Sequence, residues 1–199
     1  MLKYYTEQTM ENIARRVLNA YDEQLYRSQP CAIPIEHIIE WHGLTLEFQY
    51  LRKNGRILGK TIFDNGLEAV YDMEQRQYTL FPVKAGTILI DASLCEEEAS
   101  TGRLRFTEAH ELAHWILHKK LYVGTGESAA LQPSVKETGM EIQANMLGSA
   151  LLMPIPMVKR CFYKLRMGRD NRAVVRDMAE VFQVSRQAMR IRLTNHHLL

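Results

Sequence analysis

The sequence predicts an α+β fold, because segments with strand character and segments with helical periodicity come in separate blocks. Strand-like segments lie between residues 45 and 91, and helical segments follow from residue 105 onward. The 199 residues, 46% of them hydrophobic, are enough to bury a full core. No apolar run reaches the length of a membrane span, and the N-terminus lacks a secretion-signal pattern. We therefore expect a cytoplasmic protein with no membrane contact.

Two helices are expected before the strands. Thr9 is expected to cap the first, whose apolar residues form one stripe. These residues are Met10, Ile13, Ala14, Val17, Leu18 and Tyr21. The second is expected over residues 34–43, with an inward face formed by Ile35, Ile38 and Ile39.

Five segments have the composition and alternation of β-strands. They are residues 45–51, 60–63, 68–71, 77–83 and 87–91. The Asn65-Gly66 pair predicts a hairpin turn between the second and third of them. The last segment directly precedes the first helix of the C-terminal half.

That helix carries a His-Glu-x-x-His motif at residues 110–114. On a helix, His110 and His114 share one face and lie about 6 Å apart along the axis, so both imidazoles can reach one metal ion. Glu111 is offset around the helix, where its carboxylate is suited to activating a water rather than to binding the metal. The motif therefore predicts a Zn²⁺ hydrolase in which Glu111 is the catalytic general base. The alternative is an amphipathic helix with two solvated histidines.

Apolar residues around the motif predict a deeply buried helix and count against that alternative. They are Phe106, Ala109, Leu112, Ala113, Ile116 and Leu117. Burying two histidines and a glutamate without compensation is costly, so these groups need a role. His118 continues the spacing but lies about 12 Å from His110 along the axis, which is too far for one ion. We expect His118 to have a structural or supporting role.

A zinc enzyme of this kind needs a third protein ligand and an open coordination position. A second helix, stopped by Pro154, offers Glu141, with Asn145 on the same face to hydrogen-bond a ligating histidine. Glu137 is a competing ligand, and a solvated carboxylate at the helix start is the plainer interpretation of Glu141. Small residues would let this helix pack closely on the motif helix. They are Ala144, Gly148 and Ser149.

Residues 123–138 connect the two helices and are mostly small or polar. A connection of this length predicts a disordered linker or a lid over the cleft, and disorder is the preferred interpretation.

These two helices resemble the ImmA/IrrE family of metallo-endopeptidases. The resemblance lies in the run from Arg105 to His118, in E-x-x-A-N at 141–145 and in L-L-M-P at 151–154. It extends over roughly residues 10–193 and implies a zincin-like catalytic domain. The family's glutamate ligand falls in its E-x-x-A-N segment, which assigns the ligand set His110, His114 and Glu141. Gly148 and Met146-Leu147 depart from the family's usual residues in ways that affect packing rather than chemistry.

The resemblance also implies a substrate class. Several family members are intracellular bacterial or phage proteins that cleave DNA-binding repressors, so a protein substrate of that type is expected. An extended substrate would pair with an edge strand near residues 87–91. An ordinary core strand is the alternative there, and which strand forms the edge stays open. A second donor to the oxyanion is also open among Tyr71, Tyr78, Tyr122 and His118.

Three cysteines, Cys31, Cys95 and Cys161, are widely spaced and contain no C-x-x-C pair. This pattern indicates reduced thiols in a reducing compartment and a zinc site without thiolates.

The C-terminal segment from residue 158 is basic, with ten Lys and Arg against three Asp and Glu. Residues 174–182 and 185–193 read as a helix-turn-helix in which Ser185 caps the second helix and Gln183 replaces the usual turn glycine. Four positions have the spacing of its buried residues: Ala179, Val184, Ala188 and Ile191. Three arginines are candidates for phosphate contacts: Arg186, Arg190 and Arg192. Packing on the protease core, or docking of a protein partner, is preferred over DNA binding through 174–193.

The sequence thus predicts a catalytic domain over residues 1–157 and a basic helical segment over 158–199 that packs on it. The predicted activity is that of a zinc endopeptidase acting on an intracellular regulatory protein. The alternative is a regulator that binds DNA or a partner through its C-terminal helices and has a vestigial metal site.

Overall fold

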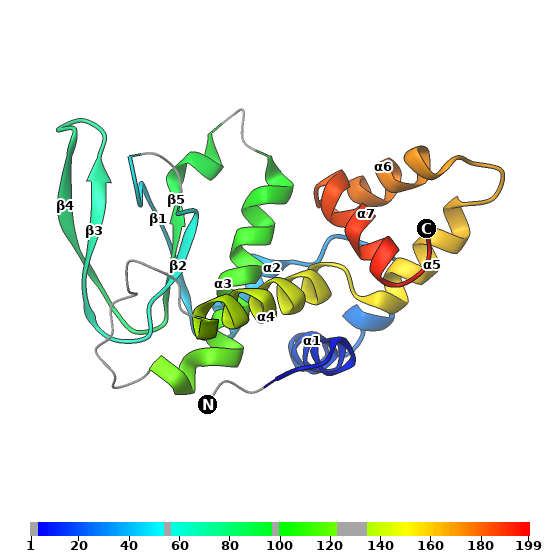
Figure 1. The fold of residues 1–199 in the computed structure, drawn as a ribbon, viewed down its shortest axis with the longest axis horizontal. Coiled ribbons are helices and arrows are strands. Elements are labelled where there is room, and N and C mark those ends of the chain that lie inside the picture. Colours follow the sequence, from blue (N-terminus) through cyan, green and yellow to red (C-terminus); the bar gives the residue numbers. More distant parts are fainter. Residues whose placement is uncertain (1–3, 54–56, 97–99, 123–134) are drawn as a thin grey trace.

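A computed structural model describes residues 4–53, 57–96, 100–122 and 135–199, with the backbone alone described for 135–137. The fold is α+β, as predicted, with small sheets at one end of the molecule and helices at the other (Figure 1). The predicted linker at 123–138 lies outside the described residues except for its last four.

The N-terminal helices lie close to their predicted positions. Helix α1 (Glu7–Tyr21) begins three residues before the prediction, because Thr6 rather than Thr9 is its N-cap. The hydroxyl oxygen of Thr6 accepts a hydrogen bond from the backbone N–H of Thr9 at 3.2 Å. After a short 3₁₀ turn, η1 (Leu25–Arg27), helix α2 (Ile35–Trp41) turns its three isoleucines fully inward, which confirms the predicted face.

All five predicted strands are present, and they form two sheets. They are β1 (Thr45–Gln49), β2 (Gly59–Thr61), β3 (Gly66–Asp72), β4 (Gln77–Val83) and β5 (Thr87–Asp91). Strand β5 is the middle of a three-stranded sheet, parallel to β1 on one side and antiparallel to β2 on the other. Strands β3 and β4 form a separate antiparallel hairpin. Strands β1 and β2 are therefore the edges of the larger sheet.

The predicted hairpin turn at Asn65-Gly66 is wrong, because β2 and β3 belong to different sheets. The Asn65 side chain instead accepts a hydrogen bond from the backbone N–H of Ala85 at 2.8 Å, which joins the two ends of the β3–β4 hairpin. The actual turn follows Asp72, whose Oδ1 accepts from the N–H groups of Glu74 and Gln75.

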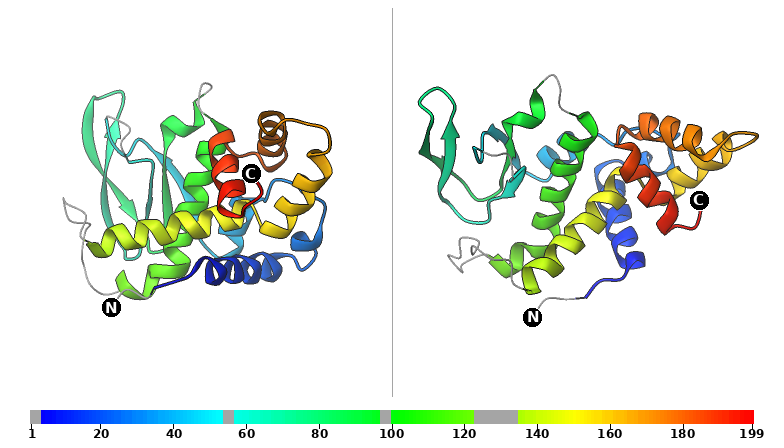
Figure 2. Two further views of the ribbon diagram at one scale, coloured as in Figure 1. Left: turned by 45° about the vertical axis from the view of Figure 1, so that its right-hand side comes forward. Right: turned by 45° about the horizontal axis from the view of Figure 1, so that its top comes forward.

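The second half of the chain is helical. After the 3₁₀ turn η2 (Ala92–Cys95) come α3 (Thr101–Tyr122), α4 (Val135–Leu152) and α5 (Ile155–Leu165). Helix α4 crosses α3 and packs against α1 (Figure 2). The α3–α4 contact is close: a Cβ added to Gly148 would lie 3.2 Å from the backbone nitrogen of His110. Helix α4 ends before Pro154, as predicted.

Helices α6 (Asn171–Phe182) and α7 (Arg186–Asn195) form the predicted helical pair. Gln183 adopts the left-handed conformation between them, with φ of 51°, where glycine is more usual. The Ser185 hydroxyl caps α7 by accepting from the N–H of Ala188 at 3.0 Å, as predicted.

Two expectations for α7 are wrong. Ile191 is 53% exposed, and Arg192 is buried rather than free for phosphates. Arg192 donates to Glu11 Oε1 at 2.5 Å and, through Nε, to the carbonyl oxygen of Met153 at 3.0 Å. Met189 and Leu193 lie on the same buried side of α7 as Arg192, and Ile191 faces out.

One apolar core cluster reaches from α1 through β5, α3 and α4 to α7. A smaller cluster lies between the β3–β4 hairpin and the larger sheet. Because the main cluster crosses residue 157, the division into 1–157 and 158–199 stays a prediction. No helix in the described part of the chain combines the length and apolar character that a bilayer span requires.

Candidate metal centre

Helix α3 places both histidines of the motif side by side, one turn apart. His110 Nε2 and His114 Nε2 lie 3.0 Å from each other, and the two side chains are 15% and 12% exposed. The two imidazole rings are therefore largely buried, and their Nε2 atoms converge on one point. This differs from the alternative interpretation, an amphipathic helix with two solvated histidines.

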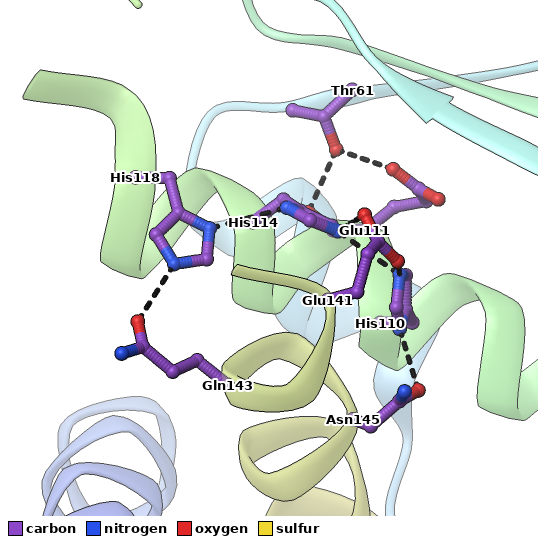
Figure 3. Close-up of polar contacts among 8 residues, drawn as sticks. All are labelled: Thr61, His110, Glu111, His114, His118, Glu141, Gln143 and Asn145. Atoms are coloured by element: carbon purple, nitrogen blue, oxygen red, sulfur yellow. Dashed lines mark hydrogen bonds and ion pairs between the residues drawn. The ribbon is translucent and has the colours of Figure 1, made fainter. Parts of the chain in front are cut away.

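Helix α4 brings Glu141 to the same point (Figure 3). Its two carboxylate oxygens lie 3.1 Å from His110 Nε2 and 3.2 Å from His114 Nε2. These contacts hold the pKa of Glu141 below its ordinary value, so the carboxylate is charged. One ligand atom from each of the three residues lies within 4.8 Å of the others. Two imidazole nitrogens and a carboxylate oxygen converging in this way fit a zinc ion with one open position. The side chain of Glu137, the competing ligand, lies outside the described residues.

Hydrogen bonds on the far side of each ring favour metal binding through Nε2. His110 Nδ1 lies 3.0 Å from Asn145 Oδ1, the contact expected for Asn145. Since that oxygen is an acceptor, the proton of a neutral His110 belongs on Nδ1, which leaves the Nε2 lone pair for a metal.

His118 orients His114 in the way that Asn145 orients His110, by a contact at Nδ1. Its Nε2 faces Gln143 Oε1 at 3.1 Å and its Nδ1 faces His114 Nδ1 at 3.1 Å. Burial, the main cause, lowers the pKa of His118 to about 4, so the ring is neutral. With its proton on Nε2, His118 accepts at Nδ1 from the Nδ1–H of His114. His114 Nε2 then keeps its lone pair on the side of Glu141.

Glu111 lies beside the histidines, between α3 and β2, and is 6% exposed. Its Oε2 accepts a hydrogen bond from the hydroxyl of Thr61 at 2.7 Å. Burial outweighs the nearby histidines and raises its pKa. A Cβ added to Gly59 would lie 2.7 Å from Glu111 Oε1, so β2 needs glycine here to make room for the carboxylate.

The four candidates for a second oxyanion donor all have other contacts. His118 uses both ring nitrogens within the helix pair. Tyr71 and Tyr78 pack edge to face on the β3–β4 hairpin, and the Tyr122 ring stacks on Phe63 with centroids 4.6 Å apart. Thr61, Gly59 and Gln143 are the residues of this site that the sequence did not single out, because each acts across elements far apart in the chain.

Comparisons with known proteins identify a family and a similar fold. Residues 72–194 match the family profile of peptidase M78, the IrrE N-terminal-like domain. A solved structure of a Mycobacterium tuberculosis transcriptional regulator is similar in fold, with a TM-score of 0.51 and 13% identity. The match covers 93% of this chain and 46% of that one, so this chain spans less than half of that protein's length. No curated protein matches the sequence. Since the family profile covers more than half of the chain, the protein belongs to the M78 peptidase family of IrrE N-terminal-like domains.

Proposed function

We propose that this protein is a zinc-dependent endopeptidase with His110, His114 and Glu141 as metal ligands and Glu111 as general base. One observation carries the proposal: the three ligand atoms lie within 4.8 Å of one another, and the buried Glu111 directly follows His110 on α3. The membership of the M78 family supports it.

Each residue at the site has a role in peptide hydrolysis. Zinc bound to His110, His114 and Glu141 would supply a Lewis acid that polarises the scissile carbonyl and acidifies water. Because the Thr61 hydroxyl fixes Glu111 Oε2, Oε1 is the atom that accepts the proton of the attacking water and passes it to the leaving amine. Asn145 and His118 hold the two imidazoles in the orientation that this ligand set requires.

We assign the substrate-pairing edge to β2 rather than to β5, because β5 already has a neighbour on each side. Strand β2 pairs with β5 alone among the described strands, and it carries both Gly59 and Thr61 against Glu111. An extended peptide added to the free edge of β2 would continue the sheet beside the ligand set.

A regulatory protein of the DNA-binding repressor type is the proposed substrate, and the cytoplasm the proposed location. The family resemblance supports this substrate, and the similar fold is that of a protein named as a transcriptional regulator. Cys31, Cys95 and Cys161 are all unpaired, which supports a reducing compartment. The alternative, a regulator with a vestigial metal site, is less well supported because the ligand set and its hydrogen-bonding partners are complete.

Elemental mass spectrometry of the purified protein tests the metal site. We expect about one zinc per chain, with loss in Glu141→Ala and no change in Glu40→Ala, a matched change at an exposed glutamate of α2. A wild-type protein without zinc, even after zinc is added, would overturn the ligand assignment.

Profiling of protein N-termini in cells that produce the wild type or Glu111→Gln tests the activity. We expect new internal N-termini with the wild type alone, while Glu111→Gln keeps its zinc. Identical N-termini in the two cultures, with zinc bound in both proteins, would favour the regulator with a vestigial site.

A further inference from the structure

A groove of about 570 Å³ is lined by residues of α6 and α7. These two helices lie at the end of the molecule opposite the β3–β4 hairpin (Figures 1 and 2). Four of its lining residues are arginines: Arg172 and Arg176 from α6, and Arg186 and Arg190 from α7. Asp170 is the single acidic residue in the lining. The groove is therefore strongly positive.

Most of this charge has no ion-pair partner in the part of the chain that the structure describes. Among the described residues, Arg172, Arg186 and Arg190 form no ion pair, whereas Arg176 pairs with Asp177 at 3.0 Å. The carboxylate of Asp170 is occupied as the N-cap of α6, where it accepts from two backbone N–H groups. Unpaired guanidinium groups on two facing helices are suited to phosphate, which accepts two parallel hydrogen bonds from each group.

The rest of the chain holds the inner side of α7 rigidly. Arg192 ties this side to Glu11 and to the Met153 carbonyl in the core. The turn before α7 packs on the start of α3, since a Cβ added to Gly102 would lie 2.6 Å from the Ser185 nitrogen. The helix is thus fixed in place by contacts that leave its other side uncovered.

The outer side of α7 carries a stripe of five exposed side chains. They are Arg186, Gln187, Arg190, Ile191 and Thr194. Polar groups that donate and accept, with one aliphatic side chain among them, are what a helix needs to contact base edges and thymine methyl groups. The left-handed turn at Gln183 and the cap at Ser185 give α6 and α7 the connection of a helix-turn-helix.

We propose that α6 and α7 bind duplex DNA, with Gln187, Ile191 and Thr194 of the outer stripe facing the base edges of the major groove. The four arginines, Arg186 and Arg190 of the stripe included, contact the flanking phosphates. A single phosphate would occupy only part of a groove lined by four guanidinium groups from two helices. The backbone of a DNA duplex presents a row of phosphates, which matches the groove better. This binding needs no metal, so it is independent of the proposed peptidase activity. The chain would then combine two activities, with the cleaved protein and the DNA bound at different places.

Fluorescence anisotropy with the full-length protein and a labelled mixed-sequence DNA duplex tests the proposal. We expect binding that weakens steeply with salt, and affinity that falls about tenfold or more in Arg190→Glu and in Arg172→Glu. Each lost phosphate contact should lower the slope of log affinity against log salt by about one. Lys164→Glu is the matched control, because this exposed lysine of α5 lies in the same basic segment but outside the groove. It should change affinity by less than about twofold.

Three results would overturn the proposal. The first is a wild-type protein that does not bind the duplex at low salt. The second is a loss of affinity in Lys164→Glu as large as that in the groove variants. The third is competition by polyglutamate that equals competition by unlabelled duplex. The last result would assign the groove to an acidic protein. Zinc content and thermal midpoint, measured on each variant, separate a loss of binding from a loss of folding.

Discussion

Nδ1 of His118 lies 3.1 Å from Nδ1 of His114, so a third histidine of the same helix orients a proposed zinc ligand. Gln143 in turn fixes the proton of His118 on Nε2, at 3.1 Å. Each proposed imidazole ligand is thus oriented by a hydrogen bond at its Nδ1: Asn145 of α4 contacts His110, and His118 of α3 contacts His114.

Removing this support should weaken zinc binding. We expect His118→Ala and the volume-conserving Gln143→Leu to raise the zinc dissociation constant about 10- to 100-fold, because His114 loses its fixed orientation. Competition with a chromophoric chelator measures the constant. His37→Ala, at an exposed histidine of α2, is the control and should bind zinc as the wild type does. Unchanged affinity in both buried variants would show that the hydrogen-bonded chain does not position His114.

Gly59→Ala should separate metal binding from catalysis. The new Cβ would lie 2.7 Å from Glu111 Oε1 and 2.8 Å from Thr107 Cγ2, so the carboxylate must move. We expect zinc content to stay near that of the wild type, while the new N-termini disappear as they do in Glu111→Gln. Gly66→Ala is the matched control, because a Cβ there meets nothing within 4 Å. Normal cleavage by Gly59→Ala would argue against the placement of Glu111 under β2.

Glu108 should make the protein less stable as pH rises. The residue is fully buried, and neither carboxylate oxygen has a hydrogen-bond partner among the described residues. Burial, helped by the charge of Glu36 and opposed by Arg105, raises its pKa to about 7. The folded chain therefore holds the proton more tightly than the unfolded chain. The free energy of unfolding should fall between pH 4.5 and 7, by up to about 3 kcal/mol from this group.

Urea unfolding of the zinc-free protein at pH 5 and pH 8 measures this effect. Glu108→Gln cannot ionise, so the decline should be smaller in the variant than in the wild type, and the variant should gain relative stability at pH 8. Other titrating groups are common to both proteins and cancel in the comparison. Parallel pH dependences in the two proteins would assign the effect to another group.

The buried Arg192–Glu11 pair gives a prediction about stability. Arg192→Met leaves the Glu11 carboxylate buried without its partner, and we expect a loss of about 3–5 kcal/mol. Adding Glu11→Leu should restore much of the lost stability, because the double variant no longer buries an unpaired carboxylate. Urea unfolding of both variants tests this, with the exposed neighbour Arg190→Met as a control that should cost little. A double variant no more stable than Arg192→Met would show that the Met153 carbonyl contact dominates.

The sequence was sufficient where residues act within one helix or one short segment. His110, Glu111 and His114 are placed by helical spacing alone, and the strand segments by composition and alternation. Glu141 required the family resemblance, because spacing within α4 did not distinguish a ligand from a solvated carboxylate.

Contacts between distant residues explain the errors. Burial of Arg192 depends on Glu11, 181 residues away, and no pattern within α7 reveals that pairing. An aliphatic Ile191 therefore looked like the inward residue. Similarly, the hydrogen bond between Thr61 and Glu111 joins residues that are 50 positions apart. Asn65 does not form a hairpin turn but accepts a hydrogen bond from Ala85 at the far end of the β3–β4 hairpin.

The apolar cluster that reaches from α1 to α7 would make folding of the C-terminal helices depend on the proposed zinc ion. An ion that binds only the folded chain stabilises every part that unfolds together with its site. Zinc shortage would therefore lower the thermal midpoint of helices that never touch the ion, and would increase the fraction of chains open to degradation. The abundance of this protein in the cell would then follow the supply of zinc.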